Sequence, residues 1–432
     1  MKKFLSICVS LSLLAATFTG CASSTPAAMA SAGNSGGGTS GKITVQFWHC
    51  MSGDNGDLTN KLVDDFNKSQ DKIKVVATYQ GSYSDAAAKA EQAIYAGNGP
   101  DLLQVAQDNV GRLATNGQFT DLLPYVKKAG INPDSFTKAF VQDAYYDGKL
   151  VDIPYGRSAQ LLHINKTVLD QVGAKIPTTW DELKEAAEKC TVQKNGKITR
   201  YGLSIPFDQW ELFALIQQAG GQFFNKDKTG LGCLDDGSAK KSFQFLKSMQ
   251  KNGALFYNDP ANDKDNQLFT QGMAAMSINS SGTITSRTKS IGSKFNYVVV
   301  PLPKDVKYSM PTGGSGFGIL SSSKQKDAAW QFMQWFVQNE KGGTAFVLGS
   351  GYLPFTQKMT QSKAIQDLWK KIPNYKVAYD ALQYGDDSYR IANLTPVIAE
   401  FRTCIQAIML DNKDVDTSLK TFSDSVNTIL AK

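Results

Sequence analysis

Hydrophobic and polar positions alternate between two patterns in the first part of the chain. Residues 43–47 alternate apolar and polar side chains, which predicts a strand, and a polar loop is expected over 48–56. Apolar residues at helical spacing over 58–66 predict a helix, and residues 72–79 return to a β-rich pattern. An Ala-rich run over 85–96 predicts a second helix before another buried strand. The repeated order of strand, helix and strand predicts a parallel sheet with right-handed crossovers.

The same kind of pattern then starts again further along the chain. Residues 161–164 read as a buried strand, and Thr179 with Glu182 forms a capping box that opens a helix. Residues 297–300 read as another strand, and the aromatic-rich segment 328–337 reads as a helix with a buried face. These patterns predict two α/β units, with the chain returning to the first after building most of the second.

The amino terminus carries a processing signal. Residues 1–20 contain two lysines followed by an apolar stretch of 15 residues, Phe4 to Phe18, which is too short to span a membrane as a helix. The segment ends at Cys21 and resembles a bacterial lipoprotein signal peptide, so Cys21 is expected to carry a lipid. Residues 21–41 are rich in Ala, Ser, Gly and Thr and predict a flexible tether. The globule is therefore expected on the extracellular face of the bacterial cell membrane, the periplasmic side in a Gram-negative cell; secretion without a lipid is the alternative.

Composition excludes several classes of protein. The chain has 432 residues, 42% of them hydrophobic, which is enough for two or three domains with full cores. Its 46 basic and 39 acidic residues are interleaved along the chain, so no nucleic-acid partner is expected. Four cysteines follow Cys21 and none has Cys-x-x-Cys spacing, which leaves two disulfides or buried free thiols open: Cys50, Cys190, Cys233 and Cys404.

Signatures of enzymes are weak in this sequence. The two histidines, His49 and His163, are not part of a metalloprotease motif, and the glycine cluster at 313–318 lacks the Gly-x-Ser-x-Gly spacing of a nucleophile elbow. The acidic cluster at 259–265 lacks the glycine and terminal Glu of a calcium loop. We therefore expect no catalytic residues, metal or cofactor. A secreted glycoside hydrolase remains a remote alternative, because paired carboxylates have no fixed sequence spacing.

Eight short motifs occur in the order found in one protein family. They are Phe47-Trp48-His49 with Gly53, Phe66-Asn67, Tyr79-Gln80-Gly81-Ser82-Tyr83, Gly99-Pro100-Asp101, Ile164-Asn165-Lys166, Pro177-Thr178-Thr179-Trp180, Phe295-Asn296-Tyr297 and Gly351-Tyr352-Leu353-Pro354. Together they resemble the extracellular solute-binding proteins of ABC transporters, in the maltose-binding-like group and nearest its glycerol-3-phosphate-binding members.

The resemblance implies a periplasmic-binding-protein-like α/β fold with two lobes. Each lobe is expected to be a mainly parallel sheet flanked by helices, with the ligand cleft between the lobes. The lobe boundaries implied are 42–153 with 299–352 for the N-terminal lobe, and 154–298 with 353–432 for the C-terminal lobe. The protein is expected to be a monomeric receptor that closes around a solute and delivers it to an ABC permease.

The resemblance also implies a set of ligand contacts. The family pattern maps them onto Tyr83, Gln107, Asp108, Ser158, Ser280, Gly314 and Tyr352. Each serine has the alternative role of a local turn residue. Trp48 and Trp210 are added because aromatic rings in predicted loops suit the CH faces of hydroxyl-rich solutes.

The expected solute depends on one position. Ile398 stands where the glycerol-3-phosphate-binding members carry a phosphate-binding arginine, with Arg157, Arg390 and Arg402 as possible replacements. Loss of a bidentate guanidinium removes the main selector for phosphate. A neutral carbohydrate or polyol is therefore expected first, and glycerol-3-phosphate or a glycerophosphodiester is the alternative.

Overall fold

The computed structural model describes residues 41–262, 264–386 and 389–431. The predicted signal peptide over residues 1–20, the predicted lipidation site Cys21 and the predicted tether up to residue 40 lie outside the described residues. Among the described helices, none is both long and apolar enough to cross a membrane.

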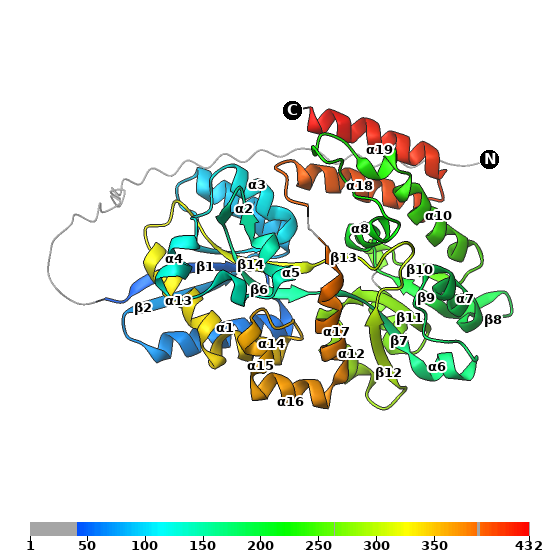
Figure 1. The fold of residues 1–432 in the computed structure, drawn as a ribbon, viewed down its shortest axis with the longest axis horizontal. Helices are drawn as coiled ribbons and strands as arrows, with labels where there is room; N and C mark the ends of the chain where they lie inside the picture. Colours follow the sequence, from blue (N-terminus) through cyan, green and yellow to red (C-terminus); the bar gives the residue numbers. More distant parts are fainter. Residues whose placement is uncertain (1–40, 263, 387–388, 432) are drawn as a thin grey trace, which may run out of the picture. The chain divides into compact units, whose positions relative to one another are not determined.

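The first lobe is built on a five-stranded sheet (Figure 1). Its order is β2 (Ile73–Tyr79), β1 (Ile43–His49), β3 (Leu102–Ala106), β14 (Gly313–Ile319) and β6 (Ile153–Ser158). The pairings β1–β2 and β1–β3 are parallel, whereas β14 is antiparallel to both of its neighbours, so four strands run the same way and β14 is reversed.

The second lobe repeats this plan. Its order is β10 (Leu255–Tyr257), β9 (Lys197–Ile205), β11 (Ala274–Ser280), β7 (Gln160–Asn165) and β12 (Tyr297–Pro301), and β8 (Val192–Lys194) pairs with β9. The strand β7 is antiparallel to β11 and β12, while β9 is parallel to β10 and β11. The predicted two-lobed α/β fold is confirmed, with one reversed strand in the main order of each described sheet.

Helices cover both faces of the first sheet. The helices of this lobe are α1 (Gly53–Ser69), α2 (Tyr83–Tyr95), α3 (Gln107–Thr115), α4 (Leu123–Lys128), α5 (Lys138–Val141), α13 (Lys326–Gln338), α14 (Ala345–Ser350) and α15 (Gln357–Gln361). Alternation along β1 and β3 sends Phe47 and Leu102 into the large core with α1 and α13, and Leu103 and Val105 into a smaller cluster under α2 and α3.

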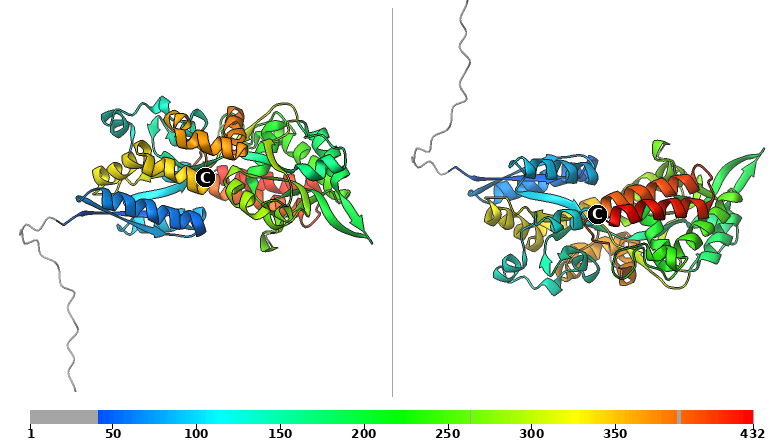
Figure 2. Two further views of the ribbon diagram at one scale, coloured as in Figure 1. Left: turned by 90° about the horizontal axis from the view of Figure 1, so that it is seen from below. Right: turned by 90° about the horizontal axis from the view of Figure 1, so that it is seen from above.

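The second lobe contains the remaining helices. They are α6 (Lys166–Gln171), α7 (Trp180–Cys190), α8 (Gln209–Gln218), α9 (Gly232–Asp235), α10 (Ser238–Lys251), α11 (Asp265–Thr270), α12 (Ile284–Ile291), α17 (Pro373–Asp380), α18 (Leu394–Met409) and α19 (Val415–Leu430), with α16 (Lys363–Lys371) between α14 and α17. Figure 2 shows the last two helices lying along this lobe, where α18 packs on α8 and α19 packs on α10.

Local sequence explains several of these boundaries. Thr179 and Glu182 form the predicted capping box at the start of α7. The predicted loop over 48–56 is shorter than expected, because β1 continues through His49 and α1 begins at Gly53. The four cysteines in the described part of the chain are free thiols, three of them buried.

The chain passes between the lobes later than the expected boundaries. The expected break after residue 153 lies at the start of β6, and the chain changes sheets only at Ala159. Pro154 does not end this strand, since β6 is the edge of its sheet, where a missing backbone donor is tolerated. The second passage follows β12, over residues 302–312, rather than preceding Val299.

The third passage is gradual. Leu353 donates its backbone N–H to Arg157 O at 2.9 Å, so this segment runs beside the first passage. Helix α15 still lies against the first lobe, where Gln357 Nε2 donates to Asp134 O at 3.1 Å. Helix α17 belongs to the second lobe, because it packs on β12.

A buried ion pair joins the first two passages. Arg157 donates to Asp143 at 2.7 Å and to Thr312 Oγ1 at 2.6 Å, and Thr312 donates to Asp143 at 2.6 Å. Arg157 and Asp143 have no exposed surface. This network, called the passage network below, holds the end of β6 against the segment that leads into β14.

Candidate functional site

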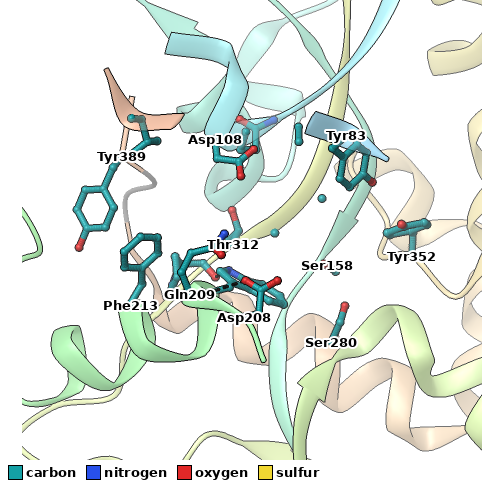
Figure 3. A pocket seen from close by; sticks show the side chains of 17 residues that line it. Tyr83, Asp108, Ser158, Asp208, Gln209, Phe213, Ser280, Thr312, Tyr352 and Tyr389 are labelled. Atoms are coloured by element: carbon teal, nitrogen blue, oxygen red, sulfur yellow. Dashed lines mark hydrogen bonds between the residues drawn. The ribbon is translucent and has the colours of Figure 1, made fainter. Parts of the chain in front are cut away.

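A cavity of about 290 Å³ lies between the two lobes (Figure 3). It is bordered by segments that follow β2, β3 and β6 of the first sheet and β9 and β11 of the second. In open α/β sheets the crevice beyond the carboxyl ends of the strands is the usual ligand site. The carboxyl ends of strands from both sheets therefore border the same cavity.

The first lobe contributes three polar side chains from the starts of two helices. Tyr83 is the first residue of α2, and its hydroxyl lies 3.5 Å from Ser315 Oγ. Gln107 and Asp108 begin α3 directly after β3. Figure 3 shows the Asp108 carboxyl pointing into the cavity.

The second lobe contributes residues from the start of α8 and the end of β11. Asp208 caps α8 by accepting the Trp210 backbone N–H at 2.9 Å, and the indole of Trp210 donates to Pro311 O at 3.1 Å. Ser280 lines the cavity and also accepts the Gly282 N–H at 3.1 Å, so the predicted turn role of this serine is real. Asp208 faces the cavity from the side opposite Asp108 (Figure 3).

The passages form the floor of the cavity. Ser158, Thr312, Gly313 and Gly314 line it, and Thr312 also belongs to the passage network. Gly314 has a φ of 97°, and a Cβ there would lie 1.9 Å from Gly156 O. Glycine is therefore required by the neighbouring strand β6, whatever the ligand.

Aromatic rings close the two ends of the cavity. Tyr83 and Tyr352 lie at one end, and Phe213 and Tyr389 lie at the other (Figure 3). Burial raises the pKa of both Tyr83 and Tyr352, so their hydroxyls stay protonated and can donate to a ligand. The Tyr389 hydroxyl already accepts the Phe223 N–H at 3.0 Å, so this residue offers mainly its ring.

The charged groups of the cavity are acidic. Burial, together with the nearby Asp208 carboxylate, raises the pKa of Asp108 to about 6. Burial also raises the pKa of Asp208. Among the described residues that line the cavity, none is Lys, Arg or His. The described lining thus offers hydrogen-bond acceptors and aromatic faces, and the ion pair that Asp208 makes with Arg402 involves a residue outside this lining.

The arginines considered for phosphate have other contacts. Arg157 is held in the passage network, and Arg390 donates to the backbone carbonyls of Gln142 and Tyr145. Arg402 donates to Gln209 Oε1 at 2.9 Å and lies 3.8 Å from Asp208. Ile398 is buried in the core.

Most of the predicted site residues come together in this cavity. Those that line it are Tyr83, Gln107, Asp108, Ser158, Trp210, Ser280, Gly314 and Tyr352. Trp48 does not line it. Because β1 extends beyond residue 47, Trp48 points to the face opposite Phe47 and packs against the cluster under α2 and α3.

Sequence reasoning missed several lining residues. Asp208 and Gln209 precede Trp210 at the start of α8, and an aspartate before a helical segment is a recognisable N-cap signal. Thr312 and Tyr389 have no such signal, since they reach the cavity through contacts with residues far away in the chain.

Comparison with known proteins identifies the family. The family model described as "Bacterial extracellular solute-binding protein" matches residues 61–374. The chain belongs to this family. Its members are solute-binding receptors rather than enzymes, which confirms the expectation of a non-enzymatic protein.

Relatives of this solute-binding protein carry different solute names. The sn-glycerol-3-phosphate-binding periplasmic protein of Pectobacterium atrosepticum is 27% identical over 365 residues, covering 79% of this chain and 80% of the relative. The maltotriose-binding protein of Pyrococcus abyssi is 26% identical over 400 residues, covering 90% and 82%. The solved ABC substrate-binding protein of Listeria monocytogenes in complex with cycloalternan has a TM-score of 0.80 at 21% identity, covering 90% and 99%, which supports the fold.

Proposed function

We propose that this solute-binding protein is a lipid-anchored receptor that binds a neutral carbohydrate or polyol between its lobes and delivers it to an ABC permease. The observation that carries the choice of solute is the cavity, which brings Asp108 and Asp208 together from opposite lobes and has no basic residue in its described lining. Sugar hydroxyls donate to carboxylates, and the CH faces of sugar rings pack on aromatic side chains. A phosphate in the same place would face two carboxylates.

We expect the two lobes to close around the solute, because each lobe supplies some of the residues that would contact it. Asp108 and Tyr83 belong to the first lobe, whereas Asp208 and Trp210 belong to the second. A solute that contacts both pairs has more interactions in the closed state, so it shifts the population of lobe arrangements toward closure. A smaller radius of gyration of the sugar-bound protein in small-angle scattering checks this step, and an unchanged radius at saturation contradicts it.

A thermal-shift screen tests the solute class. The panel contains maltose, maltotriose, lactose, sucrose, glycerol, sn-glycerol-3-phosphate and glycerophosphocholine. A solute at 100 times its dissociation constant stabilises the folded protein by about 2.7 kcal/mol. We expect that shift with at least one neutral sugar and no release of product from chromogenic glycosides. Stabilisation by sn-glycerol-3-phosphate alone contradicts the neutral class.

The named relatives favour one alternative. A relative named for sn-glycerol-3-phosphate matches most of this chain, which supports a receptor for that solute or a glycerophosphodiester. Arg402 is the residue to test for it, since its guanidinium lies 3.8 Å from Asp208 at the border of the cavity. Under this alternative Arg402→Gln lowers affinity for sn-glycerol-3-phosphate by tenfold or more, roughly the effect of losing a charged hydrogen bond.

The anchor is tested separately from the solute. Cys21→Ala is expected to release the protein from the membrane fraction while leaving sugar affinity unchanged, because the described globule begins only at residue 41. Cys50→Ala in the globule is the matched control and is expected to stay in the membrane fraction. Equal retention of the Cys21→Ala variant and the wild type contradicts the anchor.

A further inference from the structure

Three hydrogen bonds hold Ser280 at the end of β11. Its backbone N–H donates to Asn279 Oδ1 at 2.8 Å, its Oγ accepts the Gly282 N–H at 3.1 Å, and its carbonyl accepts from Thr283 Oγ1 at 2.8 Å. Figure 3 shows the Ser280 hydroxyl pointing into the cavity. Because the oxygen accepts from Gly282, the hydroxyl hydrogen can be donated to a solute.

The Asn279 side chain is itself fixed in one orientation. Its Nδ2 donates to Asp265 Oδ2 at 2.8 Å, which turns its oxygen toward the Ser280 N–H. The backbone carbonyl of Asn279 lies 3.2 Å from His163 Nε2. Burial lowers the pKa of His163 well below its usual value, so the ring is neutral. A carbonyl only accepts, so the proton of this ring is on Nε2 and is donated to Asn279.

A buried arginine holds the Asp265 carboxylate in place. Arg287 Nη2 donates to Asp265 Oδ2 and to Ser277 Oγ, at 3.2 Å in each case. Arg287 has no exposed surface, and Asp265 is 1% exposed. Removing water from two charges offsets most of their attraction, so a buried pair adds little stability by itself. What this pair supplies is a carboxylate fixed at the start of α11, where it orients Asn279.

The residue that follows Ser280 is tied to the first passage between the lobes. Ser281 donates its backbone N–H to Ala159 O at 2.8 Å, and Ala159 donates its N–H to Ser281 Oγ at 3.1 Å. Ser280 thus lies between two fixed neighbours, Asn279 on one side and Ser281 on the other. The position of its hydroxyl is set before any solute arrives.

We propose that Asp265 and Asn279 are positioning residues for solute binding: the hydrogen bonds from Asn279 to Asp265 and from Ser280 to Asn279 fix the place at which the Ser280 hydroxyl meets the solute. The inference rests on the proposed function and adds two residues that do not line the cavity of about 290 Å³ between the lobes. A hydroxyl that is fixed beforehand loses less freedom on binding, which strengthens the complex.

A double-mutant cycle on Asn279 and Ser280 tests the proposal. Asn279→Leu removes the acceptor of the Ser280 N–H and is expected to weaken sugar binding about tenfold, the scale of one hydrogen bond. Ser280→Ala removes the hydroxyl and is expected to weaken binding by a similar factor. The double variant should lose no more than Ser280→Ala alone, because Asn279 acts through Ser280. Calorimetry measures these affinities on the folded proteins, with whichever of maltose, maltotriose, lactose and sucrose binds the wild type.

A second variant separates positioning from stability. Asp265→Leu with Arg287→Met removes both buried charges together, so urea denaturation should show a stability close to that of the wild type. Asn279 then lacks the carboxylate that orients it, and sugar affinity is expected to fall about threefold or more, within the range for one hydrogen bond.

Arg200→Met is the matched control in the same lobe. It removes a donor to Cys190 O at 2.8 Å near the start of β9, at the end of that strand away from the cavity. This variant is expected to lower stability and to leave sugar affinity unchanged.

Three results would overturn the positioning role while leaving the proposed function intact. Losses that add up in the double variant of Asn279 and Ser280 would mean that Asn279 acts on the solute separately. Unchanged affinity in Ser280→Ala would remove the contact that is positioned. Unchanged affinity in Asp265→Leu with Arg287→Met would leave the buried pair a purely structural role. Failure of every sugar to bind the wild type contradicts the proposed function itself, and the positioning role fails with it.

Discussion

The one carboxylate of the passage network and the two carboxylates of the cavity have different surroundings, although Thr312 belongs to both places. In the passage network Asp143 is fully buried and accepts from both Arg157 and Thr312. In the cavity Asp108 and Asp208 are only partly buried and face each other without a basic residue in the described lining. The comparison teaches that the buried carboxylate pairs with a charge inside the protein and fixes the passages. The cavity carboxylates accept from Asn109 and from the Trp210 N–H, yet they still border space that a solute can fill.

The largest effect is expected from breaking the passage network. Asp143→Ala leaves the buried Arg157 without its carboxylate, which costs about 3 to 5 kcal/mol of unfolding free energy. Urea denaturation measures the loss. The double variant Asp143→Leu with Arg157→Met is the matched control and is expected to lose less than Asp143→Ala alone, because no uncompensated charge remains. A loss below about 1 kcal/mol in Asp143→Ala, the scale of an exposed pair, contradicts the structural role of the pair.

The next effect separates two tryptophans. Trp210→Ala removes an aromatic wall of the cavity and is expected to weaken sugar binding by about 2 to 4 kcal/mol, the scale of a binding hot spot. Trp48→Ala is the matched control, since Trp48 packs under α2 and α3 and should affect stability but not affinity. Calorimetry on both variants decides between these sites. Similar losses of affinity would mean that Trp48 contacts the solute after all.

Removing one cavity carboxylate is expected to have opposite effects on affinity and stability. Asp108→Ala loses a charge-assisted hydrogen bond to the solute, which costs about 1.5 to 3 kcal/mol of binding free energy. The same change removes a partly buried carboxylate that lies near Asp208, so the unliganded protein should unfold at equal or higher urea concentration. Loss of both affinity and stability would contradict this prediction and would show that Asp108, like Asp143, stabilises the fold.

A smaller effect is expected from pH. The pKa of Asp108 is about 6 in the folded protein, above its usual value, so the folded state holds the proton more tightly. The stabilising contribution of the protonated acid is complete below about pH 4 and is lost as the pH rises through about 6. Relative to Asp108→Asn, wild type should therefore lose stability across this range in urea denaturation.

Sugar affinity should change in the opposite sense, because the ionised carboxylate is the better acceptor. Affinity is expected to be about tenfold weaker at pH 5 than at pH 7 in wild type and nearly constant in Asp108→Asn. Equal pH dependence in the two proteins would exclude Asp108 as the titrating contact.

The sequence predicted two α/β units because several strands and helices have a local pattern, and the family resemblance added the division into lobes. Phe47, Leu62 and Phe66 show the alternation or helical spacing that places them in one core, and the structure confirms this. The passages between lobes were harder to predict, because Pro154 resembles a strand end unless its position at a sheet edge is known. Edge position depends on pairing with β14, which lies far along the chain.

The site was predictable to the extent that its residues have local signals. Tyr83 and Asp108 begin helices directly beyond strands, and both line the cavity. The prediction for Trp48 was wrong because β1 continues through Trp48 and His49. As a strand residue next to Phe47, Trp48 points to the opposite face of the sheet and away from the cavity. Tyr389 could not have been found, since its place depends on packing against Phe213 and Phe223.

The claim that the solute is uncharged is tested most directly by the salt dependence of binding. Calorimetry would compare a neutral sugar from the screen with sn-glycerol-3-phosphate at about 0.01 M and 1 M salt, where the Debye length falls from about 30 Å to about 3 Å. The account predicts tight sugar binding that hardly changes with salt, and no tight binding of the phosphate. Tight binding of sn-glycerol-3-phosphate that weakens at high salt, with no heat from any neutral sugar, would contradict it.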